Sequence, residues 1–217
     1  MKKLFVFLLF MSSSAFMPVT GFAASEAVDQ ATNFKEGVHY TRLDPQPTDT
    51  GDKIEVLEFF WYGCPHCYTF EPYVSAWEKS KAKNVAFARV PAVFRPEWEV
   101  QARSYYALSN MGKVNEISGK IFTAIHKDKK HLEKKAALVD FIVKHGVDRE
   151  TFLKEYDSFA VDGMVRKAIK KQKAYQIQGV PAIIINGKYM TSGSMAGSYD
   201  NMIKIINHLT DMESAAK

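Results

Sequence analysis

Cys64 and Cys67 are the only cysteines among the 217 residues, and just Pro65 and His66 separate them. An aromatic run that ends at Tyr62 comes directly before the pair. Two thiols at this spacing can form a structural disulfide, bind a metal ion or exchange electrons. Each possibility makes a different demand on the rest of the chain.

A structural disulfide and a metal site both fit the sequence poorly. The chain-entropy model gives a disulfide that closes so short a loop about 2 kcal/mol of stabilisation, against about 4.7 kcal/mol for a loop of about 100 residues. A zinc site needs four donors. The two thiols and His66 would supply three, and the chain has no second Cys-x-x-Cys and no His-x3-His pair. We therefore expect no structural role for the disulfide and no metal site.

Electron exchange suits the surroundings of the pair. Pro65 fits the first position of a helix, where its missing N–H costs nothing, so Cys64 should lie between a strand and a helix. Unsatisfied backbone N–H groups and the positive end of the helix dipole stabilise a thiolate there. The dipole alone lowers the thiol pKa by at most about 1.5 units. Backbone hydrogen bonds and the imidazole of His66 would supply the rest.

The direction of the redox chemistry depends on the acidity of Cys64. A stabilised thiolate makes the disulfide easier to reduce, and therefore makes the protein a better oxidant of other thiols. An ordinary thiol at Cys64 would instead indicate a reductant or an isomerase.

The elements around the pair have α/β character. Residues 53–61, KIEVLEFFW, predict a central buried strand, because apolar residues occupy both faces apart from two glutamates. A helix is expected from Pro65 to about Lys83. A second strand begins at Val85.

Helical periodicity replaces this pattern from about Glu97 to Gln176. It predicts four or five helical segments, with breaks near Gly112, His131, Gly146 and Asp157. Strand character then returns in VPAIIIN and in KYMT, which the hairpin dipeptide Asn186-Gly187 joins. A last helix is expected from about Ser198 to Leu209.

The N-terminus has the plan of a cleavable secretory signal. Two lysines after Met1 precede the apolar residues 4–11, and small and polar residues follow. The apolar stretch is shorter than the roughly 20 residues of a membrane span. Cleavage after Ala23 is favoured, and Ala24 and Ala27 remain alternatives. We expect an exported protein in an oxidising periplasm.

The charge balance argues against a nucleic-acid partner. Residues 1–23 contain two of the 29 basic side chains and none of the 24 acidic ones, so their removal leaves a net charge of +3. Nucleic-acid binding needs a concentrated basic face. The basic clusters at residues 127–135 and 166–173 are interpreted as solvated helix faces.

The segments VLEFFWYGCPHCYTFEP and GVPAIIING resemble the DsbA disulfide oxidoreductases of the thioredoxin-fold superfamily. The signal and the helical insertion fit this family, and the resemblance covers essentially the whole mature chain. DsbA is itself a known example of a strongly acidic cysteine and an oxidising couple, so the direction argued above is not independent of it.

The resemblance implies an α/β, thioredoxin-like fold with a helical domain inserted. Residues 1–23 would be the signal peptide, residues 24–96 and 177–217 the thioredoxin-like domain, and residues 97–176 the inserted helical domain. The Cys64–Cys67 disulfide would be the redox centre, with no other cofactor.

The resemblance also gives a role to Val180 and Pro181. It implies a cis peptide bond between them, in a loop that faces the disulfide. The backbone of Val180 would then pair with an extended substrate segment by strand addition. Backbone pairing selects shape rather than sequence, as an enzyme with many unfolded clients requires.

Glu58 shares a strand face with Val56 and Phe60, so its carboxylate should be buried and its pKa raised. It resembles the acidic residue below the active site in the family, and would relay protons to or from Cys67. The alternative is a carboxylate that reaches water or pairs with a lysine. Arg89 lies in the neighbouring strand, but its segment departs from the family pattern, and a basic partner is not assigned.

We expect an enzyme that donates its disulfide to newly exported, cysteine-containing proteins through a mixed disulfide. A DsbB-like membrane partner linked to quinone would regenerate it, by resemblance. Trp61, Tyr62 and Tyr68 are expected either to form an apolar docking surface or to pack in the core. The alternatives are a periplasmic isomerase or reductase, although residues 24–41 leave no room for the usual dimerisation domain, and a peptide-binding chaperone with incidental thiols.

Overall fold

The structure is a computed structural model that describes residues 34–216, in which one five-stranded sheet has the order β1-β5-β4-β2-β3. Strand β2 pairs in parallel with β3 and antiparallel with β4, and β5 is antiparallel to both β4 and β1. The strands are β1 Thr41–Arg42, β2 Ile54–Phe60, β3 Val85–Pro91, β4 Ala182–Ile185 and β5 Tyr189–Ser192.

Strand β2 is the central buried strand that the sequence predicted. It is hydrogen-bonded on both edges, and all seven of its residues are buried. Its register sets Glu58 opposite Arg89 on one side and opposite Ile183 on the other. Because side chains alternate along a strand, Glu58 lies on the same sheet face as Val56.

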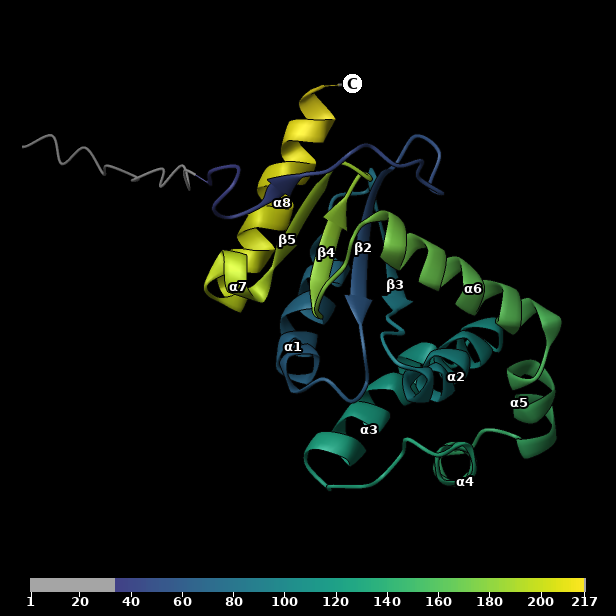
Figure 1. Cartoon of the computed structure of the whole chain (residues 1–217). Helices are drawn as coiled ribbons and strands as arrows, with labels where there is room; N and C mark the ends of the chain where they lie inside the picture. The colour runs from purple at the N-terminus through teal and green to yellow at the C-terminus, as the bar shows by residue number, and fades with distance from the viewer. Residues whose placement is uncertain (1–33, 217) are drawn as a thin grey trace, which may run out of the picture. The chain divides into compact units, whose positions relative to one another are not determined.

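One face of the sheet packs against α1 (Pro65–Ser80) and α8 (Tyr199–Ala215), next to the short α7 (Gly193–Ala196). The shared core of this face includes Val56, Val74 and Ile205. The other face is covered by α6 (Phe159–Ala174), and Leu57 and Ala168 belong to its core. Figure 1 shows α1, α7 and α8 on one side of the sheet and α6 on the other.

The chain between β3 and β4 is helical, as predicted. It forms the 3-10 helix η1 (Pro96–Trp98) and then α2 (Glu99–Asn110), α3 (Val114–His126), α4 (Lys135–Lys144), α5 (Arg149–Tyr156) and α6. The breaks between these helices fall where the sequence predicted them. Gly112 and Gly146 follow two of the helices with positive φ angles of 68° and 91°, which glycine adopts readily.

The core of these helices continues to the cysteine pair. It contains Phe60, Tyr62, Cys64 and Cys67 together with residues from α2 to α6. The helical segment and the sheet are therefore not separated by a polar boundary, and α6 itself covers the sheet. The boundaries proposed at residues 97 and 176 remain a prediction.

The ends of two helices differ from the expected positions. Helix α1 ends at Ser80, before Lys83, and α8 continues past Leu209 to Ala215. Strand β1 and helix α7 were not predicted, because each is only two to four residues long.

The Asn186-Gly187 hairpin between β4 and β5 is confirmed, with φ angles of 49° and 65°. Glycine is required at 187 for a second reason. An added Cβ would lie 2.2 Å from the carbonyl oxygen of Gln46, whose own N–H donates to the Gly187 carbonyl.

The predicted signal peptide, residues 1–23, lies outside the described residues. Within residues 34–216, no helix has the length and apolar character needed to cross a membrane.

Candidate active site

A tight turn connects β2 to α1 and carries the first cysteine. The Cys64 N–H donates to the Trp61 carbonyl at 3.0 Å, which closes a turn over residues 61–64. Cys64 then caps the helix, and Pro65 occupies its first turn. The N–H of Tyr68 donates to the Cys64 carbonyl at 3.1 Å as the first bond of α1. The predicted helix start is confirmed.

The two thiols differ in exposure. Both are free in the structure; Cys64 is 7% exposed and Cys67 is fully buried. Only the Cys64 sulfur can therefore be reached from outside. Pro65 and His66, which lie between the two, are exposed.

The surroundings shift the two thiol pKa values in opposite directions. The pKa of Cys64 is lowered to about 6, mainly by a hydrogen bond from the Cys67 thiol, and burial only partly opposes this. The backbone N–H groups of Cys67 and His66 add to the effect, and the charge of His66 contributes least. Burial raises the pKa of Cys67, and the neighbouring Cys64 and Glu58 raise it further. The arrangement can hold a Cys64 thiolate beside a Cys67 thiol.

The loop before β4 faces Cys64, as the resemblance implied. The Val180–Pro181 peptide bond is cis. The Cys64 thiol donates to the Val180 carbonyl at 3.3 Å. Val180 is half-buried and Pro181 is buried. Two segments more than a hundred residues apart thus meet at the sulfur.

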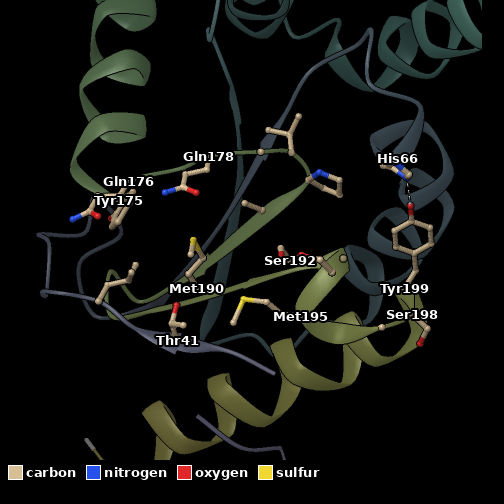
Figure 2. Close-up of a pocket in the computed structure, with 18 residues that line it drawn as sticks. Thr41, His66, Tyr175, Gln176, Gln178, Met190, Ser192, Met195, Ser198 and Tyr199 are labelled. Atoms are coloured by element: carbon tan, nitrogen blue, oxygen red, sulfur yellow. Dashed lines mark hydrogen bonds between the residues drawn. The ribbon is translucent and has the colours of Figure 1, made fainter. Parts of the chain in front are cut away.

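The His66 side chain points toward Tyr199 of α8 (Figure 2). Its Nδ1 lies 3.4 Å from the hydroxyl of Tyr199. No local signal in the sequence connects Tyr199 with His66, so this contact was not predicted. Proximity to Cys64 and Cys67 and burial together raise the pKa of Tyr199, burial being the larger cause.

Glu58 is buried and has an arginine partner. Its side chain is 1% exposed, and the Arg89 Nε–H donates to it at 2.8 Å. Arg89 also pairs with Glu71 of α1 at 3.1 Å. Burial raises the pKa of Glu58 to about 7 and exceeds the opposing effect of Arg89, whose charge is shared between two carboxylates. The alternatives of a water-exposed or lysine-paired Glu58 are wrong.

Alignment of the two parallel strands would have identified this pair. Glu58 and Arg89 are register partners of β2 and β3. Both strands were predicted from the sequence, but their register was not.

Of the aromatic residues next to the pair, Tyr62 is buried, whereas Trp61 and Tyr68 are partly buried and pack against the core. Tyr62 is 1% exposed, packs edge-to-face on Phe60 and hydrogen-bonds to Ser118. Trp61 stacks on Trp98 at a ring distance of 3.7 Å. Of the two expected roles, core packing is therefore confirmed for Tyr62.

A cavity of about 1000 Å³ lies between the loop before β4 and α7, with His66 among its lining residues (Figure 2). It combines polar side chains such as Gln176 and Gln178 with the two methionines Met190 and Met195. His66, Val180 and Pro181 lie at its edge toward Cys64. An extended peptide placed in this groove would lie against Val180, whose carbonyl oxygen is 3.3 Å from the Cys64 sulfur.

The described residues contain no group of three His, Cys, Asp or Glu side chains that could hold a metal ion.

Comparison with protein families matches residues 55–202 to the DSBA-like thioredoxin domain. The thiol:disulfide interchange protein DsbA of Pseudomonas aeruginosa is 40% identical over 188 residues, which cover 86% of this chain and 89% of the relative. The DsbA of Azotobacter vinelandii is 40% identical over 186 residues, covering 85% and 87%.

Solved structures agree with the sequence comparison. The crystal structure of Pseudomonas aeruginosa DsbA aligns with a TM-score of 0.82 at 40% identity, over 86% of this chain and 97% of that chain. A variant of Proteus mirabilis DsbA with the non-covalently bound peptide PWATCDS aligns with a TM-score of 0.71 at 25% identity, over 82% and 98%.

Proposed function

The chain belongs to the DSBA-like thioredoxin domain family and is a thiol:disulfide oxidoreductase, and we propose that it oxidises newly exported proteins by donating the Cys64–Cys67 disulfide. The observation that carries this direction is the opposite shift of the two thiol pKa values, with Cys64 lowered to about 6 and Cys67 raised. Because the dithiol form is stabilised in this way, the disulfide form is easily reduced and readily oxidises other thiols.

The first step is attack on Cys64. A client thiolate attacks the Cys64 sulfur, because Cys67 is fully buried. The Cys64–Cys67 bond breaks, a client–Cys64 disulfide forms, and Cys67 leaves with the electron pair. Glu58, whose carboxyl pKa is raised to about 7 by burial, supplies the proton that the Cys67 sulfur takes up.

The second step releases the client. A second client thiolate attacks the client sulfur of the mixed disulfide, and Cys64 leaves as a thiolate. The client has lost two electrons, and the Cys64–Cys67 pair has gained them. When an oxidant re-forms the disulfide, Glu58 accepts the proton from Cys67 again. Glu58 thus serves both halves of the cycle without net consumption.

The groove beside Val180 is proposed to hold the client. The backbone of Val180 would pair with an extended client segment by strand addition, and Pro181 would keep the loop against Cys64. The Proteus mirabilis relative with its bound peptide supports this, as does the position of Val180 at the edge of the groove. Few of these contacts would depend on the side chains of the client, which suits an enzyme with varied clients.

We place the mature protein in the periplasm after cleavage of residues 1–23 near Ala23, where clients emerge unfolded. A DsbB-like, quinone-linked membrane protein would accept the two electrons. The redox-active disulfide would be the only cofactor, and neither a metal nor a nucleic acid would take part.

The equilibrium of the Cys64–Cys67 pair with glutathione tests the direction. We expect a potential far more oxidising than that of thioredoxin, which is about −270 mV. A value close to thioredoxin's would indicate a reductase or isomerase. A Cys64→Ser variant should lose client oxidation entirely. If it still suppressed aggregation of cysteine-free clients as well as the parent does, the protein would be a chaperone.

A further inference from the structure

The turn before Cys64 is contacted by a histidine that lies far away in the sequence. Nε2 of His126, the last residue of α3, lies 2.8 Å from the Tyr62 carbonyl oxygen. A carbonyl oxygen only accepts hydrogen bonds, so Nε2 must carry the hydrogen. Protonation of the ring at Nδ1 leaves this donor in place.

Other contacts fix the orientation of the His126 ring. It stacks on Tyr68, with ring centres 4.9 Å apart and an interplanar angle of 14°. Tyr68 is the residue whose N–H donates to the Cys64 carbonyl. His126 therefore contacts the chain on both sides of the cysteine pair, before Cys64 and after Cys67.

The peptide that His126 contacts is the central one of the turn over residues 61–64. Rotation of a central peptide interconverts type I and type II turns, and type II requires a positive φ at the third residue. Gly63 is that residue, and it does not have a positive φ in the structure. Glycine tolerates either sign, so residue 63 does not itself select one turn.

Gly63 is required for a different reason. An added Cβ would lie 2.3 Å from the Trp61 indole, which is held in its stack on Trp98. The same lack of a side chain leaves the central peptide free to rotate. A separate contact has to hold it, and the His126 hydrogen bond is directed at this peptide.

We propose that His126 is a positioning residue, which selects one orientation of the Tyr62–Gly63 peptide and so sets the direction of the backbone dipole beside Cys64 at the start of α1. Cys64 is the last residue of this turn and the cap of the helix, so rotation of the central peptide would reverse the Tyr62–Gly63 peptide dipole close to its sulfur. The inference rests on the proposed function only for the direction of its effect on the disulfide.

Two substitutions separate the hydrogen bond from the packing. Leucine in His126→Leu keeps apolar bulk beside Tyr68 but has no donor, whereas the amide of His126→Gln retains one. Loss of one hydrogen bond changes an equilibrium by about five-fold. We expect His126→Leu to make the disulfide about five-fold harder to reduce with glutathione and to reduce Cys64 thiolate absorbance near neutral pH. His126→Gln should stay within about two-fold of the wild type.

His145 provides the matched control. Its Nδ1 lies 2.7 Å from the Phe141 carbonyl on α4, so it makes the same kind of histidine–carbonyl contact away from the turn. His145→Leu should leave the glutathione equilibrium and the thiolate absorbance unchanged.

Nuclear magnetic resonance of the full mature protein tests the contact directly. In the wild type, His126 should carry its hydrogen on Nε2, and the Gly63 amide resonance should move in His126→Leu but not in His126→Gln. An Nδ1–H tautomer in the wild type would overturn the proposal even if a variant failed to fold. Equal effects of the two substitutions, or none, would also overturn it. A wild-type Cys64 with an ordinary thiol pKa would contradict the proposed function, whereas the Gly63 resonance would still decide the role of His126.

Discussion

Glu58 and Arg89 face each other across two parallel strands and are joined by an ion pair of 2.8 Å with almost no access to water. Burial favours the neutral form of Glu58 more strongly than Arg89 favours its charge. Arg89 also contacts Glu71, so neither carboxylate has the guanidinium to itself. The pair therefore places a carboxyl group that titrates near neutrality in the core.

This carboxyl group predicts an unusual dependence of stability on pH. The pKa of Glu58 rises from 4.5 to about 7 on folding, so between these pH values the folded chain holds a proton that the unfolded chain has released. Stability contributed by Glu58 is present below pH 4.5 and falls as pH rises to 7, by roughly 3 kcal/mol. Glu58→Gln should remove this decline. Urea unfolding of both proteins between pH 4.5 and 7 is the measurement, and parallel curves would contradict the prediction.

Cys64 should make the unfolding free energy depend on pH in the opposite direction, and only in the dithiol form. Its pKa falls from 9.0 to about 6 on folding, so ionised Cys64 stabilises the folded dithiol fully above pH 9. This stability is lost as pH falls to 6, and amounts to roughly 4 kcal/mol. We expect the unfolding free energy of the dithiol, minus that of the disulfide form, to rise with pH over this window. Cys64→Ala cannot form the disulfide, and its own unfolding free energy should lack this rise between pH 6 and 9. A flat difference in the wild type would count against the acidic thiol.

Removal of the imidazole at position 66 should have a limited effect. The charge of His66 is the smallest of the causes that lower the Cys64 pKa. His66→Ala should raise that pKa and make the disulfide harder to reduce, by less than about ten-fold in the glutathione equilibrium. Tyr199→Phe, which removes the hydroxyl near Nδ1, is the companion variant. A thiolate titration that is unchanged in His66→Ala would exclude the imidazole from the mechanism.

The groove can be tested through its methionines. Met195 lies on α7 and lines the cavity, so Met195→Glu introduces a charge where a client would lie. We expect the KM for oxidation of an unfolded protein to rise several-fold, while the rate with dithiothreitol stays unchanged. Met212→Glu is the matched control, since Met212 is 37% exposed on α8. If both substrates slowed together, the groove would not be the client site.

Features encoded locally were predictable from the sequence. Alternating and continuous apolar residues defined β2, Pro65 marked the start of α1, and glycines marked helix ends at 112 and 146. The cysteine pair could be assigned a chemistry because its spacing, Pro65 and His66 are contiguous. Each of these depends on a few neighbouring residues.

Features created by tertiary contact were not predictable in this way. The partner of Glu58 depends on strand register, and the contact of His126 depends on where α3 ends. Helix α8 extends past Leu209 because the nearly buried Glu213 meets Lys188 of the hairpin at 2.7 Å. A polar helix end gives no hint of that ion pair.

The short contact between the Cys64 sulfur and the Val180 carbonyl has a consequence for the order of events. It needs a hydrogen on the sulfur, and neither the disulfide nor the thiolate has one. Both working forms therefore leave the carbonyl without this donor and open to an amide of an arriving chain. Only the fully protonated dithiol covers the Val180 carbonyl with its own hydrogen bond. At low pH the reduced enzyme therefore shields the backbone edge that the disulfide form and the thiolate form leave open to a client.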